Sequence, residues 1–393
     1  MRKALLVILV STMLVTLFAG CAQEAPKPAA PKTETKPAAP PAPAKPIKIG
    51  VSMPLTGPVA LNGEMITKSV KLAVKQINAK GGIKGRPIEL KIADDRSDPK
   101  EGANIANMFV QDPDIVCVIC NANSSVYLAA APIYNKGKLP SISPDCSSPL
   151  LTNNGPYINR ITLSDALQGA KEAEFIWQDG HRKIAIFFEN TDFGRGVYAA
   201  CDNRFKALGG EILAVEAAVL GESKDFSPII TKFRRSGAQA VAIGANYTES
   251  ALLVKQMRAS NLNIPVYGTQ GLFTPAFLQI GGKGVEGVFT HGGVTLEEPT
   301  PELLQFQKDY ETEYNIKGEI GKYTTEGYDV ANMFIECMLN GGAEREKIKE
   351  YLAGMKQFKG AQTTYTFIGG GDVDFVLKRF VVKDGQFKLF KPK

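Results

Sequence analysis

The chain is poor in the residues on which catalysis and metal binding most often depend. Its 393 residues include two histidines, His181 and His291, and one tryptophan. The histidines are far apart in sequence, and neither has a cysteine or histidine at metal-ligand spacing, so we expect no zinc site. No nucleophile elbow, phosphate-binding loop or dinucleotide fingerprint occurs. These absences argue against an enzyme and against a bound cofactor or metal ion.

Cysteine is present, but its pattern does not indicate a disulfide framework. After Cys21 an odd number of cysteines is spread along the chain, namely Cys117, Cys120, Cys146, Cys201 and Cys337. Cys117 and Cys120 form a C-x-x-C pair inside an apolar segment, where a strand would point them to opposite faces. Buried, unreactive thiols are therefore favoured over a redox or metal-binding pair.

The positive charge of the chain does not indicate a basic surface. The formal charge of +6 includes two basic residues within 1–21 and four lysines and two glutamates within 22–46. The remaining residues carry a net charge of only +2. A balance so close to neutral gives no electrostatic footprint for nucleic acid, and we expect no such partner.

The first 21 residues are similar to a bacterial lipoprotein signal peptide. Arg2 and Lys3 precede an apolar run, 4–18, that is short for a membrane span, and the segment ends in "FAGC" at Cys21. This pattern predicts removal of the peptide and lipidation of Cys21, which anchors a protein without spanning the membrane. An ordinary N-terminal anchor helix is the alternative.

The composition of residues 22–46 predicts an extended tether. Eight of these 25 residues are proline and eight are alanine. Such a composition cannot bury a core and favours a semi-rigid, extended chain. The 347 residues from Ile47 onward are enough for two domains.

From Ile47 apolar strands alternate with helices. The helix expected over 62–79 places Ile66, Val70, Ala73 and Ile77 on one face. The first unit is predicted to contain strands at 47–53, 88–95, 115–120 and 139–144 and helices at 62–79, 99–111 and 125–136. Such alternation implies a parallel sheet covered by helices on both faces.

The alternation restarts after Asp165. Helices are expected at 166–179, 195–208, 226–236 and 248–259, and strands at 183–190, 211–219, 240–245 and 265–269. A third region, 291–393, contains helices and short strands that we expect to return to both units. The sequence therefore predicts two α/β lobes with several connections between them.

Polar residues follow the strands of both units. In open α/β sheets ligands bind beyond the carboxyl ends of the strands. The segments expected there are rich in Ser, Asn, Thr and Gln: 56–62, 121–125, 145–148, 190–194, 246–249 and 270–273. A single polar loop is ordinary because loops lie at the surface, but six at equivalent strand ends favour a cleft between two lobes.

Several motifs resemble type I periplasmic binding proteins of the branched-chain amino acid transport class. These are "IKIGVSMPLTGPVALNGEM", "INAKGGIKGRPIEL", "ADDRSDPKEG", "LPSISPDCSSPLLT", "NTDFGRG", "KDFSPIITKFRRSGA" and "TTEGYDVANM". The resemblance covers nearly all of 47–393. It implies two Rossmann-like lobes with parallel sheets, joined by three hinge crossovers near residues 164, 290 and 374. The lobes are expected at 47–164 plus 291–374 and at 165–290 plus 375–393.

The resemblance implies that the first lobe holds the carboxylate of an amino acid ligand. The stretch "VCVICNANSSVYLAAAP" passes from an apolar strand through Asn123, Ser124 and Ser125 into a helix. Ser124 matches the family's carboxylate-binding serine, and hydroxyl and N–H groups at a helix start suit an anion. Capping of the helix by Ser124 or Ser125 is the alternative. Ser147 matches the second carboxylate contact, with Asp145 and Cys146 supplying backbone groups.

The second lobe departs from the family at its ammonium-binding position. Phe193 stands for a tyrosine that precedes Gly-x-Gly, Tyr247 matches the next aromatic contact, and Gln270 replaces a frequent glutamate. A neutral amide gives up a charge-assisted bond of about 1.5–3 kcal/mol. Asp165 is a candidate substitute for that charge, and Asn62 stands where leucine binders have a bulky apolar residue.

The resemblance implies a lipid-anchored, extracytoplasmic solute receptor of an ABC importer. Its partners would be a permease and a small amino acid, amide or carboxylate solute, and we expect a monomer. A receptor of the same fold that signals to a partner protein is the alternative, although the signal peptide and tether favour the importer. The identity of the solute is left open.

Overall fold

The computed structural model describes residues 45–318 and 320–391. The expected signal peptide, Cys21 and tether residues 22–44 lie outside the described residues. Residues 44–393 group into one compact unit, which is described here by itself. Within the described ranges, none of the helices combines the length and hydropathy needed to cross a membrane.

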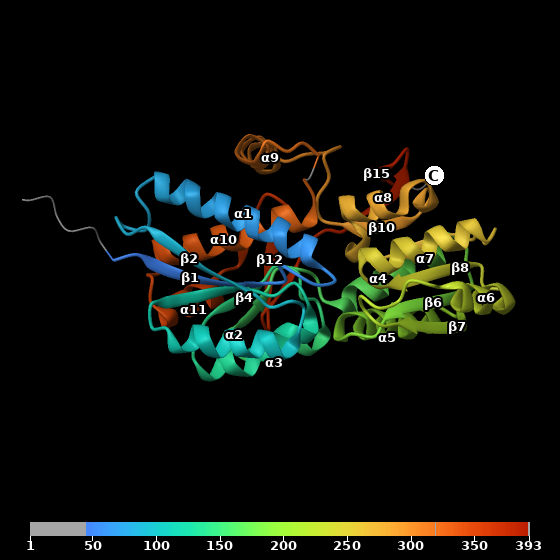
Figure 1. The fold of residues 1–393 in the computed structure, drawn as a ribbon, viewed down its shortest axis with the longest axis horizontal. Helices are drawn as coiled ribbons and strands as arrows, with labels where there is room; N and C mark the ends of the chain where they lie inside the picture. The colour runs from blue at the N-terminus through green and yellow to red at the C-terminus, as the bar shows by residue number, and fades with distance from the viewer. Residues whose placement is uncertain (1–44, 319, 392–393) are drawn as a thin grey trace, which may run out of the picture. The chain divides into compact units, whose positions relative to one another are not determined.

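The first lobe is built on a five-stranded parallel sheet with strand order β2-β1-β3-β4-β5 (Figure 1). The strands are β1 (Ile47–Met53), β2 (Ile88–Asp94), β3 (Ile115–Cys120), β4 (Ser141–Ser143) and β5 (Ile158–Arg160). The helices are α1 (Ala60–Ala79), α2 (Pro99–Gln111), α3 (Ser124–Lys136), α10 (Lys322–Asn340) and α11 (Arg345–Gly354). Helices α1, α10 and α11 pack on one face of the sheet, and α2 and α3 pack on the other.

The second lobe is built on a seven-stranded sheet with strand order β15-β14-β10-β9-β8-β6-β7. Its strands are β6 (Lys183–Glu189), β7 (Glu211–Ala218), β8 (Ala240–Gly244), β9 (Val266–Gly268), β10 (Phe289–Gly292), β14 (Lys378–Lys383) and β15 (Gln386–Leu389). Helices α4 (Asp165–Gln178) and α5 (Asp192–Ala207) cover one face. Helices α6 (Ser227–Ser236), α7 (Tyr247–Ala259) and α8 (Pro275–Gly281) cover the other.

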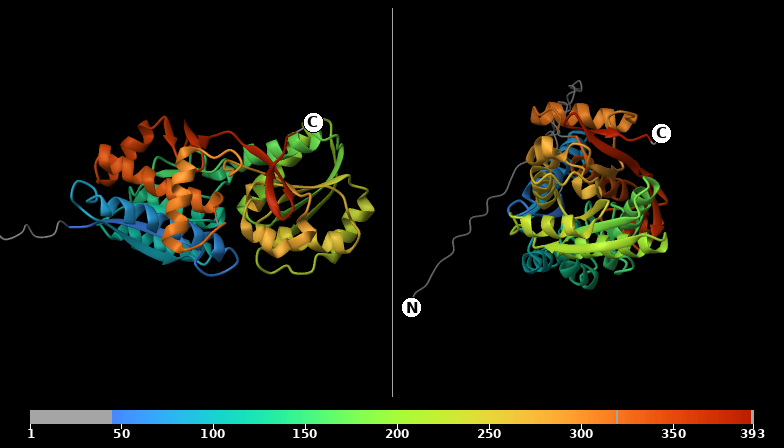
Figure 2. Two further views of the ribbon diagram at one scale, coloured as in Figure 1. Left: turned by 90° about the horizontal axis from the view of Figure 1, so that it is seen from above. Right: turned by 90° about the vertical axis from the view of Figure 1, so that its right-hand side faces the viewer.

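The chain passes between the lobes three times. It leaves the first sheet after β5 for α4, returns after β10 through α9 (Pro301–Tyr314) to α10, and leaves again for β14. Figure 2 shows the C-terminal strands, in red, running onto the second lobe. A small antiparallel sheet precedes this last passage, with β11 (Gln357–Lys359), β12 (Thr364–Gly369) and β13 (Asp372–Asp374). The predicted fold class is confirmed, whereas the exact lobe boundaries remain a prediction.

Most elements begin and end within a few residues of their predicted positions. On α1, Ile66, Val70 and Ala73 are buried as their spacing predicts. Strand β5 was not predicted, because in it Ile158 is followed by two polar residues, which gives no apolar run. Three short turns of helix also join the elements, at Pro149–Leu151, Gln270–Leu272 and Gly282–Val285.

Helices α1 and α10 cross at a glycine. A Cβ added at Gly327 would lie 2.5 Å from the backbone oxygen of Ile66. The absence of a side chain therefore lets the two backbones approach closely. This contact fixes the first turns of α10, which carry Lys322 and Glu326.

All five cysteines of the described residues are free and buried, which agrees with the expectation for Cys117 and Cys120. Cys117 packs in the core beneath α1 and α10, whereas Cys120 packs in the core beneath α2 and α3. The two thiols thus lie on opposite faces of the first sheet. Burial raises the pKa of the Cys117 thiol well above its ordinary value, which makes it unreactive.

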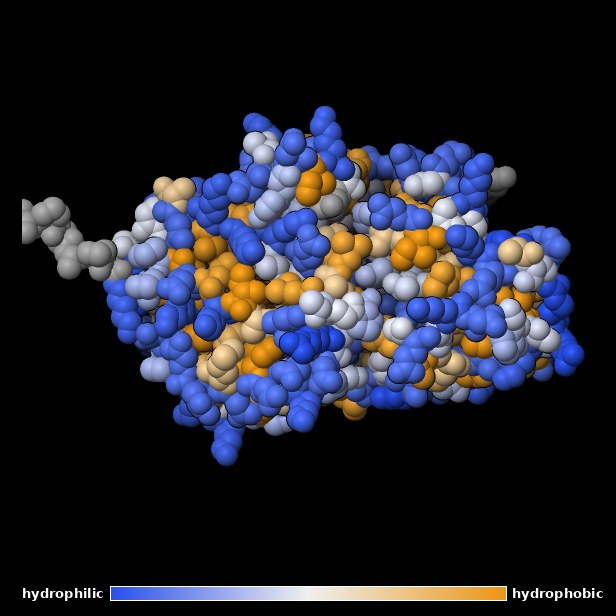
Figure 3. All heavy atoms as spheres, in the orientation of Figure 1, coloured by the Kyte–Doolittle hydropathy of each residue, from blue (hydrophilic) through white to orange (hydrophobic). Residues whose placement is uncertain are grey.

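The surface mixes polar and apolar residues. Figure 3 shows hydrophobic residues gathered between α1 and α2, over the edge of the first sheet. Strand β2 forms that edge, and its Leu90 and Ile92 are half-buried.

Arg160 at the end of β5 ties three segments together. Its buried guanidinium donates to Asp372 through Nε at 2.9 Å, to the Ser148 carbonyl at 2.7 Å and to Thr152 Oγ1 at 2.7 Å. The Asp372 carboxylate also forms an ion pair with Nη2 at 2.8 Å. A buried, fully hydrogen-bonded ion pair is costly to break by removing one partner.

We expect Arg160→Met to lower the free energy of unfolding by about 3–5 kcal/mol, because it leaves Asp372 without its cation. Urea unfolding followed by circular dichroism measures this change. Arg204→Met is the control, since Arg204 pairs with Glu174 at the surface and should cost about 1 kcal/mol or less. Equal losses in the two variants would contradict a structural role for Arg160.

Candidate functional site

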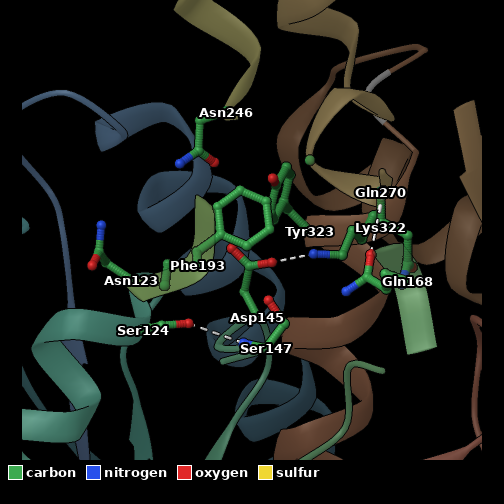
Figure 4. Close-up of a pocket in the computed structure, with 12 residues that line it drawn as sticks. Asn123, Ser124, Asp145, Ser147, Gln168, Phe193, Asn246, Gln270, Lys322 and Tyr323 are labelled. Atoms are coloured by element: carbon green, nitrogen blue, oxygen red, sulfur yellow. Dashed lines mark hydrogen bonds and ion pairs between the residues drawn. The ribbon is translucent and has the colours of Figure 1, made fainter. Parts of the chain in front are cut away.

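A pocket lies between the two lobes at the carboxyl ends of their strands (Figure 4). The space not occupied by protein atoms is about 360 Å³ when the part that is open to solvent is included. The first lobe contributes Ala122, Asn123, Ser124, Asp145, Ser147, Lys322 and Tyr323. The second lobe contributes Gln168, Phe193, Asn246, Gln270 and Gly271. We call this the interlobe pocket.

Ser124 is the first residue of α3 and is buried at the pocket wall. Its Oγ accepts hydrogen bonds from the backbone N–H groups of Ser147 and Ser148, both at 3.1 Å. A hydroxyl has two lone pairs and one proton, so the proton of Ser124 remains available for a ligand. Ser124 therefore joins the loops after β3 and β4 and still has a donor to offer.

Asn123, and not a serine, caps α3. Its side chain accepts a hydrogen bond from the backbone N–H of Ser125 at 3.1 Å. The capping role considered for Ser124 or Ser125 is thus filled by the preceding residue.

Ser125 points across to the second lobe. Its Oγ donates to Asp192 Oδ2 at 2.7 Å and accepts from the Asp192 backbone N–H at 3.2 Å. Asp192 is the first residue of α5, so the pair links the starts of one helix from each lobe. Ser125 is consequently engaged with protein and lies outside the pocket lining.

The interlobe pocket contains a buried ion pair. The Lys322 ammonium bonds to Asp145 Oδ1, as Figure 4 shows, and it also lies 3.6 Å from Glu326 Oε2. The side chains are only 4%, 11% and 0% exposed, in the order Lys322, Asp145, Glu326. Asp145, which we expected to supply backbone groups, therefore presents its carboxylate.

The Lys322 ammonium lies between the carboxyl groups of Asp145 and Glu326, and this arrangement shifts the pKa values of Lys322 and Glu326. Burial alone would lower the pKa of Lys322, but the carboxylates of Asp145 and Glu326 raise it above its ordinary value. Burial raises the pKa of Glu326 to about 8, although Lys322 opposes the shift. Lys322 is therefore charged at neutral pH, whereas Glu326 is largely protonated.

The second lobe presents carboxamides to the pocket. Gln270 is 1% exposed, and neither its Oε1 nor its Nε2 has a hydrogen-bond partner among the described residues. Its backbone N–H donates to Gln168 Oε1 at 3.4 Å, and Gln168 Nε2 donates to the Leu163 carbonyl at 2.8 Å. Gln168 is thus positioned by protein, whereas Gln270 is free to bind.

Asn246 is held by a buried carboxyl group behind it. Its Nδ2 donates to both oxygens of Glu189, at 3.0 and 2.9 Å, and its backbone N–H donates at 2.9 Å. Burial raises the pKa of Glu189 to about 7. These bonds fix the start of α7 at the pocket.

Tyr323 provides a hydroxyl with no hydrogen-bond partner among residues 45–318 and 320–391. It is 2% exposed and lines the pocket next to Lys322. A buried hydroxyl that lacks a partner is costly, so a ligand group or water is expected to bind it.

Six of the eleven predicted ligand-binding residues line the pocket: Asn123, Ser124, Asp145, Ser147, Phe193 and Gln270. The structure places the other five outside the lining: Ser125, Cys146, Tyr247, Asn62 and Asp165. The Cys146 thiol faces the Asn121 carbonyl at 3.3 Å, and the Tyr247 side chain packs in the core of the second lobe. Asn62 is fully buried on α1.

Asp165 does not provide the expected counter-charge in the pocket. It is 0% exposed and lies outside the pocket lining. Burial raises its pKa well above the ordinary value, which disfavours the charged form. The acidic group at the pocket is Asp145 instead.

Sequence reasoning missed Gln168, Asn246, Lys322 and Tyr323. Lys322 and Tyr323 lie at the start of a helix in the third region, far in sequence from the other candidate residues. A lysine at the start of a helix is ordinarily expected to face solvent. Asn246 lay within a loop that we did expect at a strand end, so its position was an available signal. Gln168 lies inside a helix and had no such signal.

The part of the chain that the structure describes contains no group of three or more His, Cys, Asp or Glu arranged to hold a metal ion. The polar side-chain groups that line the pocket are hydroxyl, amide, carboxylate and ammonium groups. Such a set suits a small polar organic molecule.

The chain belongs to the periplasmic binding protein family, whose model matches residues 46–376. Leu/Ile/Val-binding protein homolog 1 of Brucella abortus is 32% identical over 249 residues, which cover 63% of this chain and 67% of that protein. The crystal structure of the leucine-binding protein LivK from Thermotoga maritima is similar with a TM-score of 0.81 and 26% identity, covering 88% and 98% of the chains.

LivJ, a branched-chain amino acid transporter substrate-binding protein from Streptococcus pneumoniae, was solved in complex with isoleucine. It is similar with a TM-score of 0.82 and 25% identity, covering 88% of this chain and all of that one. The resemblance read from the sequence motifs is thereby confirmed at the level of family and fold.

The Glu326 carboxyl group should make stability depend on pH. A raised pKa means that the folded protein binds this proton more tightly than the unfolded chain, whose glutamate pKa is about 4.3. The stabilisation is complete below that value and is lost as the pH rises through about 8. We expect Glu326→Gln to remove this loss, so that the variant gains stability relative to the natural chain as the pH rises from 5 to 9.

Urea unfolding of both proteins at pH 5, 7 and 9 measures this difference. Glu350→Gln is the control, because the Glu350 side chain is exposed at the surface. A difference between Glu326→Gln and the natural chain that stays constant with pH would contradict the raised pKa.

Proposed function

We propose that the protein is the lipid-anchored solute receptor of an ABC importer. It captures a small amino acid-like, amide or carboxylate solute in the interlobe pocket and delivers it to a permease. The observation that carries this proposal is a polar pocket lined by both lobes, in which the side-chain amide of Gln270 is buried without a hydrogen-bond partner in the part of the chain that the structure describes. The names of the relatives, which include leucine- and Leu/Ile/Val-binding proteins, support the same role.

Closure of the two lobes over the solute is part of the proposal. The Ser125–Asp192 hydrogen bonds join the lobes directly. A second close contact between the lobes supports a closed arrangement. A Cβ added at Gly221 of the second lobe would lie 2.8 Å from the Pro58 side chain of the first lobe. We place the hinges near residues 164, 290 and 374, and we expect the receptor to act as a monomer.

The proposal includes the cell-envelope location. Cys21 would carry the lipid, and residues 22–46 would hold the folded part away from the membrane on its extracytoplasmic side. No feature of the described residues favours a signalling receptor over transport, so we do not pursue that alternative.

A test of solute binding uses the unpartnered hydroxyl of Tyr323. A library of amino acids, amides and small carboxylates is first screened by thermal shift, where a ligand at 100 times its Kd stabilises by about 2.7 kcal/mol. With the solute found, Tyr323→Phe should weaken binding by about 0.5–1.5 kcal/mol without lowering stability, since no protein bond is lost.

Tyr134→Phe is the matched control. The Tyr134 side chain is buried in the core of the first lobe and lies outside the pocket lining. Calorimetric titration should show unchanged affinity in this variant. The proposed site would be contradicted if no compound of the library bound to the protein. Equal affinities of the natural chain, Tyr323→Phe and Tyr134→Phe for the solute would contradict it as well.

A second test addresses the anchor. Mass spectrometry of the protein extracted from membranes should find an N-terminus at a lipidated Cys21, because the preceding residues resemble a lipoprotein signal. Cys21→Ser should abolish lipidation while the thermal melting of the folded part stays the same. Recovery of an intact Met1, or of cleavage at another site, would refute the lipoprotein assignment.

A further inference from the structure

The relatives' names point to branched aliphatic amino acids, but the pocket of this chain lacks an aliphatic wall. None of its twelve lining residues is Val, Leu, Ile or Met. Its apolar contacts are limited to Ala122 and the rings of Phe193 and Tyr323. A branched aliphatic side chain would therefore face mainly hydroxyl and amide groups, which it cannot satisfy.

The fixed charges of the pocket already neutralise each other. Asp145 and Lys322 are the only charged residues in the lining, and they are bonded to one another. A carboxylate or ammonium group of the solute that lies next to Lys322 and Asp145 would have to share or break this buried pair. Breaking such a pair by withdrawing one partner is strongly unfavourable.

Gln270 presents a donor and an acceptor that the protein leaves unpaired. Its Nε2 and Oε1 are buried, and neither has a partner among the described residues. A carboxamide carries a C=O acceptor and N–H donors side by side, so one such group can satisfy both atoms at once. The Lys322–Asp145 pair offers the same combination, a donor next to an acceptor.

We propose that the interlobe pocket recognises a small, uncharged solute that bears a carboxamide. The amide group pairs with Gln270 and with the donor–acceptor pair formed by Lys322 and Asp145. This inference rests on the proposed function and narrows its solute class, since it excludes branched-chain amino acids and simple carboxylates as the preferred ligands.

The test compares five probes of related size and different charge by calorimetric titration of the purified full chain. The probes are propionamide, propionate, propylammonium, L-alanine and L-leucine. We expect propionamide to bind about tenfold or more tightly than each of the others, because only it satisfies Gln270 without disturbing the ion pair. Failure of propionamide to bind, or tighter binding of any other probe, overturns the carboxamide assignment.

Two variants sharpen the result. Gln270→Leu should weaken propionamide binding about tenfold, and Gln270→Glu should shift the preference from propionamide towards L-alanine by a similar factor. Thermal melting establishes that each variant is folded, and the ranking for the natural chain stands even where a variant does not fold. Unchanged propionamide affinity in folded Gln270→Leu overturns the role of Gln270.

The outcomes separate this inference from the proposed function. Tighter binding of L-leucine than of propionamide would leave the receptor role in place and refute only the solute class. A complete lack of binding by these probes and by the wider solute library would refute both.

Discussion

The backbone N–H and C=O groups in loops that follow parallel strands cannot pair with a neighbouring strand, so they need other hydrogen-bond partners. The structure of the interlobe pocket depends on which side chains provide these partners. Ser124 accepts hydrogen bonds from two N–H groups in the loop after β4. The Arg160 guanidinium donates a hydrogen bond to the carbonyl of Ser148 in the same loop. The loop that carries Asp145 and Ser147 is therefore fixed at several points by the protein itself, which keeps the pocket organised before a solute arrives.

Buried charge imposes a second constraint on the site. Lys322 lies at the start of α10, and the close crossing at Gly327 holds that helix against α1. The ammonium consequently remains between Asp145 and Glu326, and the protein balances the charge within its own side chains. A pocket that is electrically balanced in this way discriminates by hydrogen-bond geometry more than by net charge.

Much of the fold could be predicted because α/β alternation is a local signal. The spacing of Ile66, Val70 and Ala73, and the change of character after Cys120, both follow from periods that a short window reveals. The candidate site was harder, because its residues come from segments distant in sequence. The strand-end rule indicated the loops that contain Ser124 and Ser147, and the family resemblance singled out these two serines. Lys322, in contrast, meets Asp145 only because the third region of the chain returns to the first lobe.

The Ser125–Asp192 pair has a kinetic consequence. Its hydrogen bonds join the two lobes without contacting the interlobe pocket, so they do not distinguish one solute from another. They must nevertheless break before the lobes can separate. In the proposed receptor, such an interaction would prolong the residence time of an enclosed molecule and leave its selectivity unchanged, so that affinity and specificity could vary independently.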